Sequence, residues 1–143
     1  MRMNKQHFFF LILGYLVLAL TSCSPLSNIG QKNTETDLRQ RVDMLWNARV
    51  NKDWNTVYEL ADTAFKTKTP KAEFVSSGEL QPVLSYQIID IEKVNDTHTD
   101  VTVKFKLEKM GFILNPQMRE SWIFEKGNGW QLNRTQMYSK KPF

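Results

Sequence analysis

The stretch Val101-Thr102-Val103-Lys104-Phe105-Lys106-Leu107-Glu108 decides the fold class of this 143-residue chain. Apolar and polar side chains alternate strictly through it, and this period of two is typical of a β-strand with one buried and one solvent-facing side. Asn95 and Asp96 stand a few residues before it, and both residue types favour turns. The pattern therefore predicts a strand that follows a tight turn and belongs to an antiparallel sheet.

Further strands are predicted on both sides of this stretch. Segment 84–91 is mostly apolar, but the parity of its apolar positions changes near Ile88, which indicates a bulge or a strand buried on both faces. Beyond the stretch, a loop over 111–116 leads to a strand over 120–125. Asn128-Gly129 is a strong hairpin signal and joins that strand to a last one. We therefore expect an antiparallel sheet of about four strands.

The first half of the chain predicts helices instead. Thr36 is a candidate cap for a first helix, whose apolar positions recur at helical spacing on one face. This stripe comprises Leu38, Val42, Leu45 and Trp46. Asp53 is a good cap for a second helix over 54–65, and Thr69-Pro70 starts a third helix that stops at Gly78. Helices followed by antiparallel strands predict an α+β domain with the helices on one face of the sheet.

The first 22 residues have the layout of an export signal. Arg2 and Lys5 precede an apolar run over 8–20, which is shorter than the roughly 20 residues that cross a bilayer. Cys23 is the one cysteine of the chain, so it has no disulfide partner there. The alternatives are an uncleaved membrane helix or an ordinary secretory signal cleaved after Ser24. We expect a signal over 1–22, a tether over 23–36, one α+β domain over 37–138 and a tail over 139–143.

Leu20-Thr21-Ser22-Cys23 resembles the lipobox of bacterial lipoprotein precursors. The resemblance implies that the Cys23 thiol receives a diacylglyceryl group, that the chain is cut just before it, and that the new amino group is acylated, for example with palmitate. Three acyl chains would hold the protein on a membrane permanently. Ser24 after the cysteine implies the outer membrane, on its periplasmic side, with the inner membrane or another cell envelope as the alternative.

The charge balance of the chain argues against a nucleic-acid partner. The chain has 19 basic and 15 acidic residues, and loss of Arg2 and Lys5 with the signal leaves 17 against 15. Two lysine clusters stand out, with Lys66, Lys68 and Lys71 in the first and Lys104, Lys106 and Lys109 in the second. Neither has the concentration of basic and aromatic residues typical of a phosphate track, and we interpret both as solvated surface.

Few residues suit catalysis or metal binding. His98 is the single histidine left after removal of the signal, and we expect it to be exposed without a role. One histidine and a lipid-bearing cysteine provide no metal-ligand cluster, no thiol nucleophile and no Ser-His-Asp triad. We therefore expect neither a metal nor a cofactor.

A further resemblance, to the nuclear-transport-factor-2-like superfamily, covers roughly residues 38–134. It is carried by the Lys52-Asp53-Trp54 break, the run from Tyr58 to Phe65, the turn from Pro70 to Phe74, and the hairpin from Trp122 to Trp130. The resemblance implies a strongly curved sheet that wraps a long N-terminal helix and forms a cone. The open end of such a cone can hold a pocket.

Isomerase-like members of that superfamily use a carboxylate and a tyrosine in the cone. The carboxylates nearest to apolar stripes are Asp62, Asp90 and Glu120, and the matching phenols are Tyr58 and Tyr86. No family motif places any of them, and we favour structural roles for all five. The candidates for lining a pocket are Trp46, Trp54, Trp122 and Trp130, although aromatic residues at these spacings more often belong to a core.

Two functions from different classes follow. We favour a non-enzymatic, lipid-anchored envelope module that binds a protein partner or a small apolar ligand. The alternative is a cofactor-free isomerase or dehydratase that uses Asp62 or Asp90 with a tyrosine, in a pocket of about 300 Å³ or more. A homodimer formed through the exposed sheet face is a further expectation.

Overall fold

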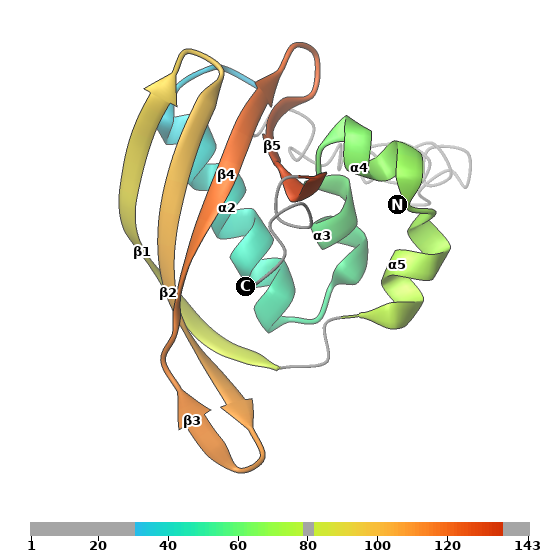
Figure 1. Cartoon of the computed structure of the whole chain (residues 1–143), viewed down its shortest axis with the longest axis vertical. Helices are drawn as coiled ribbons and strands as arrows, with labels where there is room; N and C mark the ends of the chain where they lie inside the picture. The colour runs from blue at the N-terminus through green and yellow to red at the C-terminus, as the bar shows by residue number, and fades with distance from the viewer. Residues whose placement is uncertain (1–30, 79–81, 136–143) are drawn as a thin grey trace, which may run out of the picture.

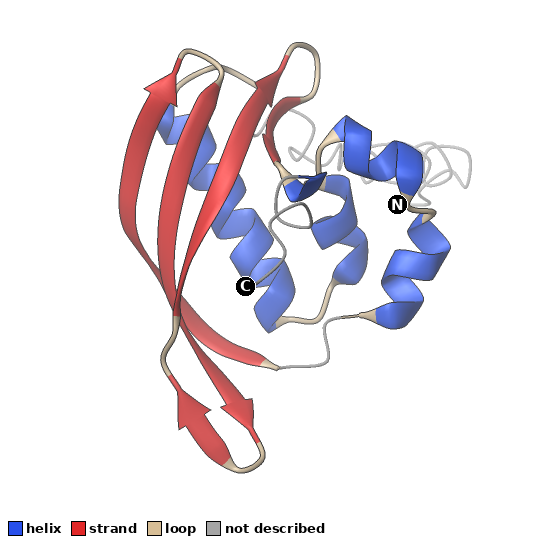
Figure 2. Cartoon of the chain, viewed as in Figure 1, coloured by secondary structure: helices blue, strands red, loops and turns tan. Residues whose placement is uncertain are grey.

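The computed structural model describes residues 31–78 and 82–135. Its helices gather on one face of an antiparallel sheet of five strands, which confirms the expected α+β class (Figures 1 and 2). The predicted signal, the lipobox and the tail lie outside the described residues. No helix in the described part of the chain is long and apolar enough to cross a membrane.

The longest helix, α2 (Glu35–Val50), lies along the inner face of the sheet. Its cap is Thr34, whose Oγ1 accepts a hydrogen bond from the backbone N–H of Asp37 at 3.2 Å. The sequence had suggested Thr36, but the cap two residues earlier places two acidic side chains in the first turn, where they complement the helix dipole. The expected apolar stripe is confirmed, since Leu38, Val42, Leu45 and Trp46 are all buried.

The expected helix over 54–65 is wrong, because the chain divides there into α3 (Trp54–Glu59) and α4 (Thr63–Lys68). Between them the backbone pairs with the end of the sheet: Leu132 donates its N–H to the carbonyl of Leu60 at 2.8 Å, and Asp62 donates to the carbonyl of Leu132 at 3.0 Å. Asp62 then caps α4. The expected cap at Asp53 is confirmed.

The third helix follows the prediction closely. It forms α5 (Lys71–Ser77), with Pro70 just before it and Gly78 at its end. Gly78 has a φ of +51°, a conformation that favours glycine, and an added Cβ would lie 3.2 Å from the indole nitrogen of Trp54. The predicted end at Gly78 is confirmed. The expected cap at Thr69 is wrong, because Pro70 is itself the N-cap and no side chain caps this helix.

The sheet comprises β1 (Val83–Asn95), β2 (His98–Lys109), β3 (Phe112–Leu114), β4 (Gln117–Glu125) and β5 (Gly129–Leu132). Its order is β1-β2-β4-β5, with β3 paired to β2. The register shifts between Ile88 and Asp90, which confirms the bulge, and Phe124 opposite Trp130 confirms the last hairpin. The side chains of β2 alternate between buried and exposed, as expected from the opening stretch.

One strand was missed, because the expected loop over 111–116 contains β3. Met110 and Gly111, both with positive φ, make a tight turn that sends the chain back antiparallel to β2, with Phe112 opposite Lys109. Since β1 pairs with β2 only as far as Leu107, this hairpin continues beyond the sheet as a two-stranded ribbon (Figure 1).

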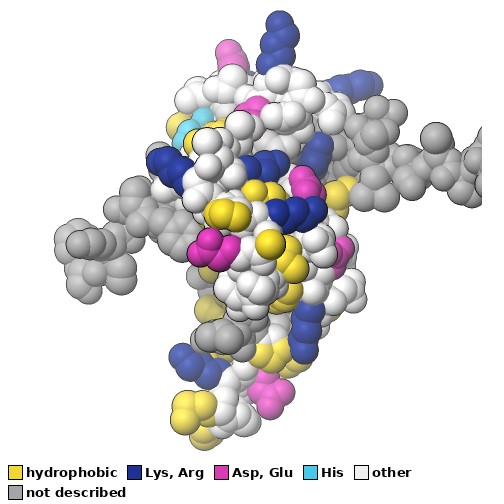
Figure 3. Space-filling view, turned by 90° about the vertical axis from the view of Figure 1, so that its right-hand side faces the viewer, with side chains coloured by type: hydrophobic (Ala, Val, Ile, Leu, Met, Phe, Trp, Pro, Cys, Tyr) yellow, Lys and Arg dark blue, Asp and Glu magenta, His cyan; other side chains and the backbone are white. Residues whose placement is uncertain are grey.

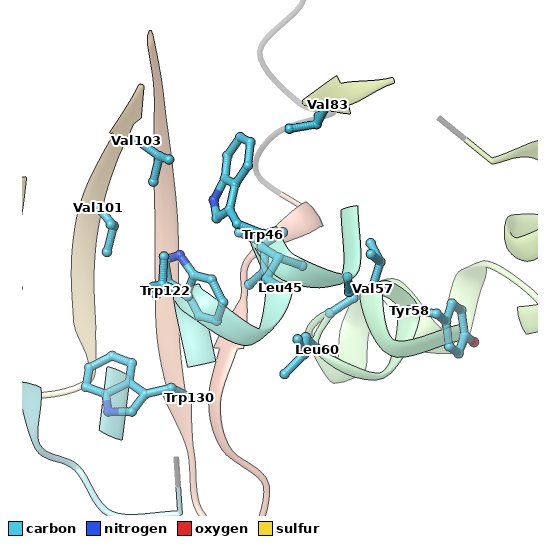
Figure 4. Packing of buried hydrophobic residues seen from close by; sticks show 14 of the residues in the cluster. Leu45, Trp46, Val57, Tyr58, Leu60, Val83, Val101, Val103, Trp122 and Trp130 are labelled. Atoms are coloured by element: carbon cyan, nitrogen blue, oxygen red, sulfur yellow. The ribbon is translucent and has the colours of Figure 1, made fainter. Parts of the chain in front are cut away.

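The core lies between α2 and the inner face of the sheet, where large aromatic side chains interlock (Figure 4). Trp46 from α2 and Trp122 from β4 are 1% and 0% exposed. The Trp46 ring lies 4.9 Å from that of Phe105 and 5.9 Å from that of Tyr86, measured between ring centroids. These contacts fill the space between helix and sheet.

A buried ion pair joins the same two layers. Arg49 Nη1 of α2 donates to Glu120 Oε1 of β4 at 2.7 Å, and the two side chains are 3% and 0% exposed. Trp46 Nε1 donates to the other carboxylate oxygen at 3.1 Å, while the guanidinium of Arg49 lies over the Trp46 ring. A carboxylate taken out of water is tolerated here because each of its oxygens has a hydrogen-bond donor.

We predict that Arg49→Met lowers the free energy of unfolding by about 3–5 kcal/mol, because it leaves the Glu120 carboxylate buried without its cation. The control is Arg39→Met, which removes an exposed ion pair with Glu35 and should change stability by no more than about 0.5 kcal/mol. Adding Glu120→Gln to Arg49→Met should restore part of the loss. Urea unfolding followed by tryptophan fluorescence measures all three, and equal stability of the two single variants would contradict the prediction.

Candidate ligand pocket between α4 and α5

Asp62, the first catalytic candidate, is 1% exposed and has donors around both carboxylate oxygens. Its Oδ1 accepts from the N–H of Phe65 at 2.8 Å and from Thr135 Oγ1 at 2.9 Å, and its Oδ2 accepts from the N–H of Arg134 at 2.7 Å. The side chain thus joins the start of α4 to the segment after β5. This arrangement is that of a structural cap, and it aims no carboxylate oxygen at an open pocket.

The remaining carboxylate candidates lie apart from Asp62. Glu120 is held by Arg49 and Trp46 in the core, as described above. Asp90 is exposed on β1 beside the bulge. The structure therefore brings none of the three carboxylate candidates together.

The two phenols also make structural contacts. Tyr58 donates its hydroxyl to the carbonyl of Thr69 at 2.8 Å, which ties α3 to the end of α4. Tyr86 donates to the backbone carbonyl and the carboxylate of Asp43, at 3.2 and 3.1 Å. Burial, together with the Asp43 charge, raises the pKa of Tyr86 to about 12, so this hydroxyl stays protonated at neutral pH and ties β1 to α2.

The four tryptophans do not line a common pocket. Trp46, Trp122 and Trp130 belong to the core, and Trp54 packs against its edge under Gly78. The interior that a cone would have left open is thus occupied by aromatic rings in this part of the chain (Figure 4).

One pocket with two aromatic rings in its lining lies on the helical side, between α4 and α5, with a volume of about 560 Å³. It is lined by Phe65, Lys68, Thr69, Glu73, Phe74, Ser77 and Thr135. Phe65 and Phe74 meet edge to face, with ring centroids 5.8 Å apart, and the buried guanidinium of Arg134 lies 4.8 Å from the Phe74 ring. The volume is in the range of small-molecule sites.

The chemistry of this pocket suits binding better than proton transfer. Its apolar floor is formed by the two phenylalanines, while Lys68 and Glu73 are exposed at its rim. No histidine lines it, and its one carboxylate is a solvent-facing side chain. A ligand would therefore be held by apolar contact and oriented by rim charges of opposite sign.

Sequence reasoning missed this pocket. Phe65 and Phe74 were recognised as apolar positions of two helices, but most of the other lining residues are polar and give no periodic signal. The pocket lies where the chain breaks between two helices: α3 ends at Glu59, and Asp62 caps the start of α4, which packs Phe65 against Phe74 of α5. A capping aspartate inside an apparently continuous helical pattern was the one available signal.

His98 lies on the outer face of the sheet, in a polar network. Its Nε2 is 2.6 Å from Ser121 Oγ and 3.3 Å from Asp100, which also pairs with Arg119. Arg119 binds Glu92 as well, at 2.7 Å. Over residues 31–78 and 82–135, no group of three or more His, Cys, Asp or Glu side chains is arranged to hold a metal ion.

Comparisons with known proteins bear on the fold. No family model matches the sequence, and no curated protein matches it. The crystal structure of a SEC-C motif containing protein from Psychrobacter arcticus is similar, with a TM-score of 0.56 and 10% identity, over 67% of this chain and 58% of that one. The solution structure of a SEC-C motif containing protein from Rhodopseudomonas palustris gives a TM-score of 0.54 and 12% identity, over 71% and 76%.

These similarities correct the expected family. The resemblance to the nuclear-transport-factor-2-like superfamily is wrong, because the similar solved structures are SEC-C motif containing proteins. The comparisons also give no support to the lipobox resemblance. At 10–12% identity they show the fold alone, an α+β arrangement of a helical region and a five-stranded antiparallel sheet. This chain spans less than two thirds of the Psychrobacter protein's length.

We predict that Asp62→Ala lowers the free energy of unfolding by about 2–4 kcal/mol, because it removes a helix cap and leaves buried N–H groups without an acceptor. The matched control is Asp90→Ala, at an exposed position, which should change stability by no more than about 0.5 kcal/mol. Urea titration of the full chain measures both. Indistinguishable midpoints for the two variants would show that Asp62 has no capping role.

Proposed function

We propose that this protein is a lipid-anchored, periplasm-facing envelope lipoprotein whose α+β domain is a non-enzymatic binding module. In this proposal Cys23 carries the lipid, Ser24 directs the protein to the outer membrane, and the α4–α5 pocket holds a small apolar ligand. The observation that carries the binding function is the pocket of about 560 Å³ over Phe65 and Phe74.

The start of the described chain is compatible with an anchor. Asn33 donates its side-chain amide to the carbonyl of Asp96 at 2.6 Å, and the Lys32 N–H donates to Asp37 at 2.6 Å, so the chain is held against the domain from about Lys32 onward. Eight residues then separate that point from Cys23. If these residues act as the tether that we propose, a random-coil linker of this length would have a root-mean-square reach of about 15 Å, which would keep the domain close to a membrane.

The contacts of the candidate residues support binding over catalysis. The isomerase or dehydratase alternative needs a carboxylate and a phenol that point into one pocket. Asp62 and Glu120 accept hydrogen bonds from within the fold on both oxygens, and Tyr58 donates to a backbone carbonyl. The isomerase or dehydratase alternative therefore rests on no specific contact among the described residues.

The anchor predicts that cells fed a fatty-acid analogue incorporate it into the wild-type chain and that Cys23→Ser abolishes the label. The unmodified variant should also run as an unprocessed precursor, because in this proposal cleavage requires the lipid-bearing cysteine. Ser22→Thr, a neighbouring change that leaves the thiol, is the control and should still be labelled. Equal labelling of wild type and Cys23→Ser would overturn the anchor.

The pocket predicts selective entry of apolar reagents. Ser77 lines the pocket and its neighbour Ser76 does not, so Ser77→Cys and Ser76→Cys form a matched pair. In the proposed lipoprotein the native Cys23 thiol carries lipid and does not react with maleimides. At each position we compare the modification rate by N-phenylmaleimide with the rate by a carboxyethyl maleimide. We expect this ratio of rates to be about tenfold higher at position 77 than at position 76, because burial of an aryl ring in the pocket contributes about 1–2 kcal/mol. Naphthalene should protect position 77. An equal reagent preference at both positions would refute ligand binding there.

A further inference from the structure

The ribbon beyond the sheet exposes an unusual concentration of large apolar side chains. Met110, Phe112, Ile113 and Leu114 are 89%, 72%, 52% and 44% exposed, and we name these four residues the apolar tip. They occupy five successive positions of the chain together with Gly111, and Figure 3 shows apolar side chains at the narrow lower end of the molecule. Contiguous exposed apolar side chains of this kind mark an interaction site.

The register of the ribbon places apolar side chains on both of its faces. Directly opposed residues share a face, so Phe112 and Leu114 lie on the side of Lys109 and Leu107, whereas Ile113 lies on the side of Glu108. Met110 lies in the turn. A flat protein interface would cover one face of such a ribbon and leave the other in water. An apolar medium that surrounds the tip would cover both.

Positive charge lies just behind the apolar tip. Strand β2 exposes three lysines near the tip, Lys104, Lys106 and Lys109. Between Lys104 and Gln117 the sequence has one acidic residue, Glu108. The ribbon therefore has a net charge of +2 beside its apolar end. Apolar residues ahead of lysines are the pattern that binds an anionic lipid surface, where each lysine near the surface adds to the attraction.

We propose that the apolar tip inserts into the surface of an anionic lipid bilayer, with the lysines of β2 at the phosphate level. A membrane adapts to a convex tip, whereas a protein partner would need a matching groove. An isolated two-stranded ribbon is only marginally stable in water. Burial of the apolar side chains of the tip in lipid would stabilise this ribbon.

Tether and tip lie at opposite ends of the domain. Asn33 contacts Asp96 at the β1–β2 turn, whereas the tip lies beyond the other end of β2, and the 12 residues of that strand span about 40 Å. Contact of both ends with one bilayer therefore lays the long axis of the domain along the membrane. With a lipid at Cys23, tip insertion becomes an intramolecular event, so a weak local affinity is sufficient.

The test uses the full chain in vesicles and an environment-sensitive nitrobenzoxadiazole dye on a single introduced cysteine. Ile113→Cys and Met110→Cys place the dye at the tip, Asn55→Cys on α3 is the exposed control, and the unsubstituted chain measures any labelling of Cys23. In vesicles of phosphatidylethanolamine and phosphatidylglycerol, we expect doxyl groups on the lipid acyl chains to quench the dye at 113 and at 110 but not at 55.

Charge and self-association are then separated. Lys106→Gln with Lys109→Gln should lower the ratio of inserted to free tip by about thirtyfold, since each lysine near an anionic surface adds about 1 kcal/mol. Tryptophan fluorescence confirms that each labelled variant is folded. Quenching at 113 no greater than at 55 would overturn the proposal. Dye shielding that grows with protein density and persists without anionic lipid would overturn it in favour of a second copy as the partner. Neither result depends on the α4–α5 pocket.

Discussion

The ion pair between Arg49 and Glu120 is the contact on which the arrangement of helix and sheet depends. A buried carboxylate is costly unless a cation and hydrogen-bond donors meet it, and α2 supplies both to Glu120 of β4 through Arg49 and Trp46. In this arrangement Trp46 stacks on the Tyr86 ring of β1 and meets the Phe105 ring of β2 at a tilt, and the apolar stripe of α2 faces the sheet. The aromatic rings then fill the interior, which leaves little space there for a ligand.

A second constraint, at Asp62, shapes the helical side of the molecule. The backbone between α3 and α4 is taken up by pairing with Leu132, and Asp62 then binds both the start of α4 and the segment that follows β5. The turn between the helices sets Phe65 against Phe74 and opens the pocket beside them. Asp62, a catalytic candidate in the sequence, thus has a structural role instead: it caps the helix whose Phe65 lines the pocket.

Local patterns were sufficient to predict much of the fold, and long-range pairings were not. The alternation from Val101 to Leu107 and the bulge near Ile88 depend on burial along a single strand, which a sequence displays directly. The break between α3 and α4 depends on hydrogen bonds to Leu132, about seventy residues away, and helical spacing continues across it. Arg49 stands where the apolar stripe fades, so its partnership with Glu120 could not be seen without the sheet register. The α4–α5 pocket could not be predicted either, because it too depends on long-range contacts.

The surface chemistry distinguishes two regions that could meet a partner. The outer face of the sheet carries the linked charges of Glu92, Asp100 and Arg119, and protein interfaces are depleted in carboxylates such as the first two. A homodimer through that face stays a prediction, but it would have to bury or rearrange this network. The apolar tip differs from this face, because its side chains are exposed to water and their transfer into apolar surroundings lowers the free energy. This contrast favours the apolar tip over the outer face of the sheet as the surface for the proposed membrane contact.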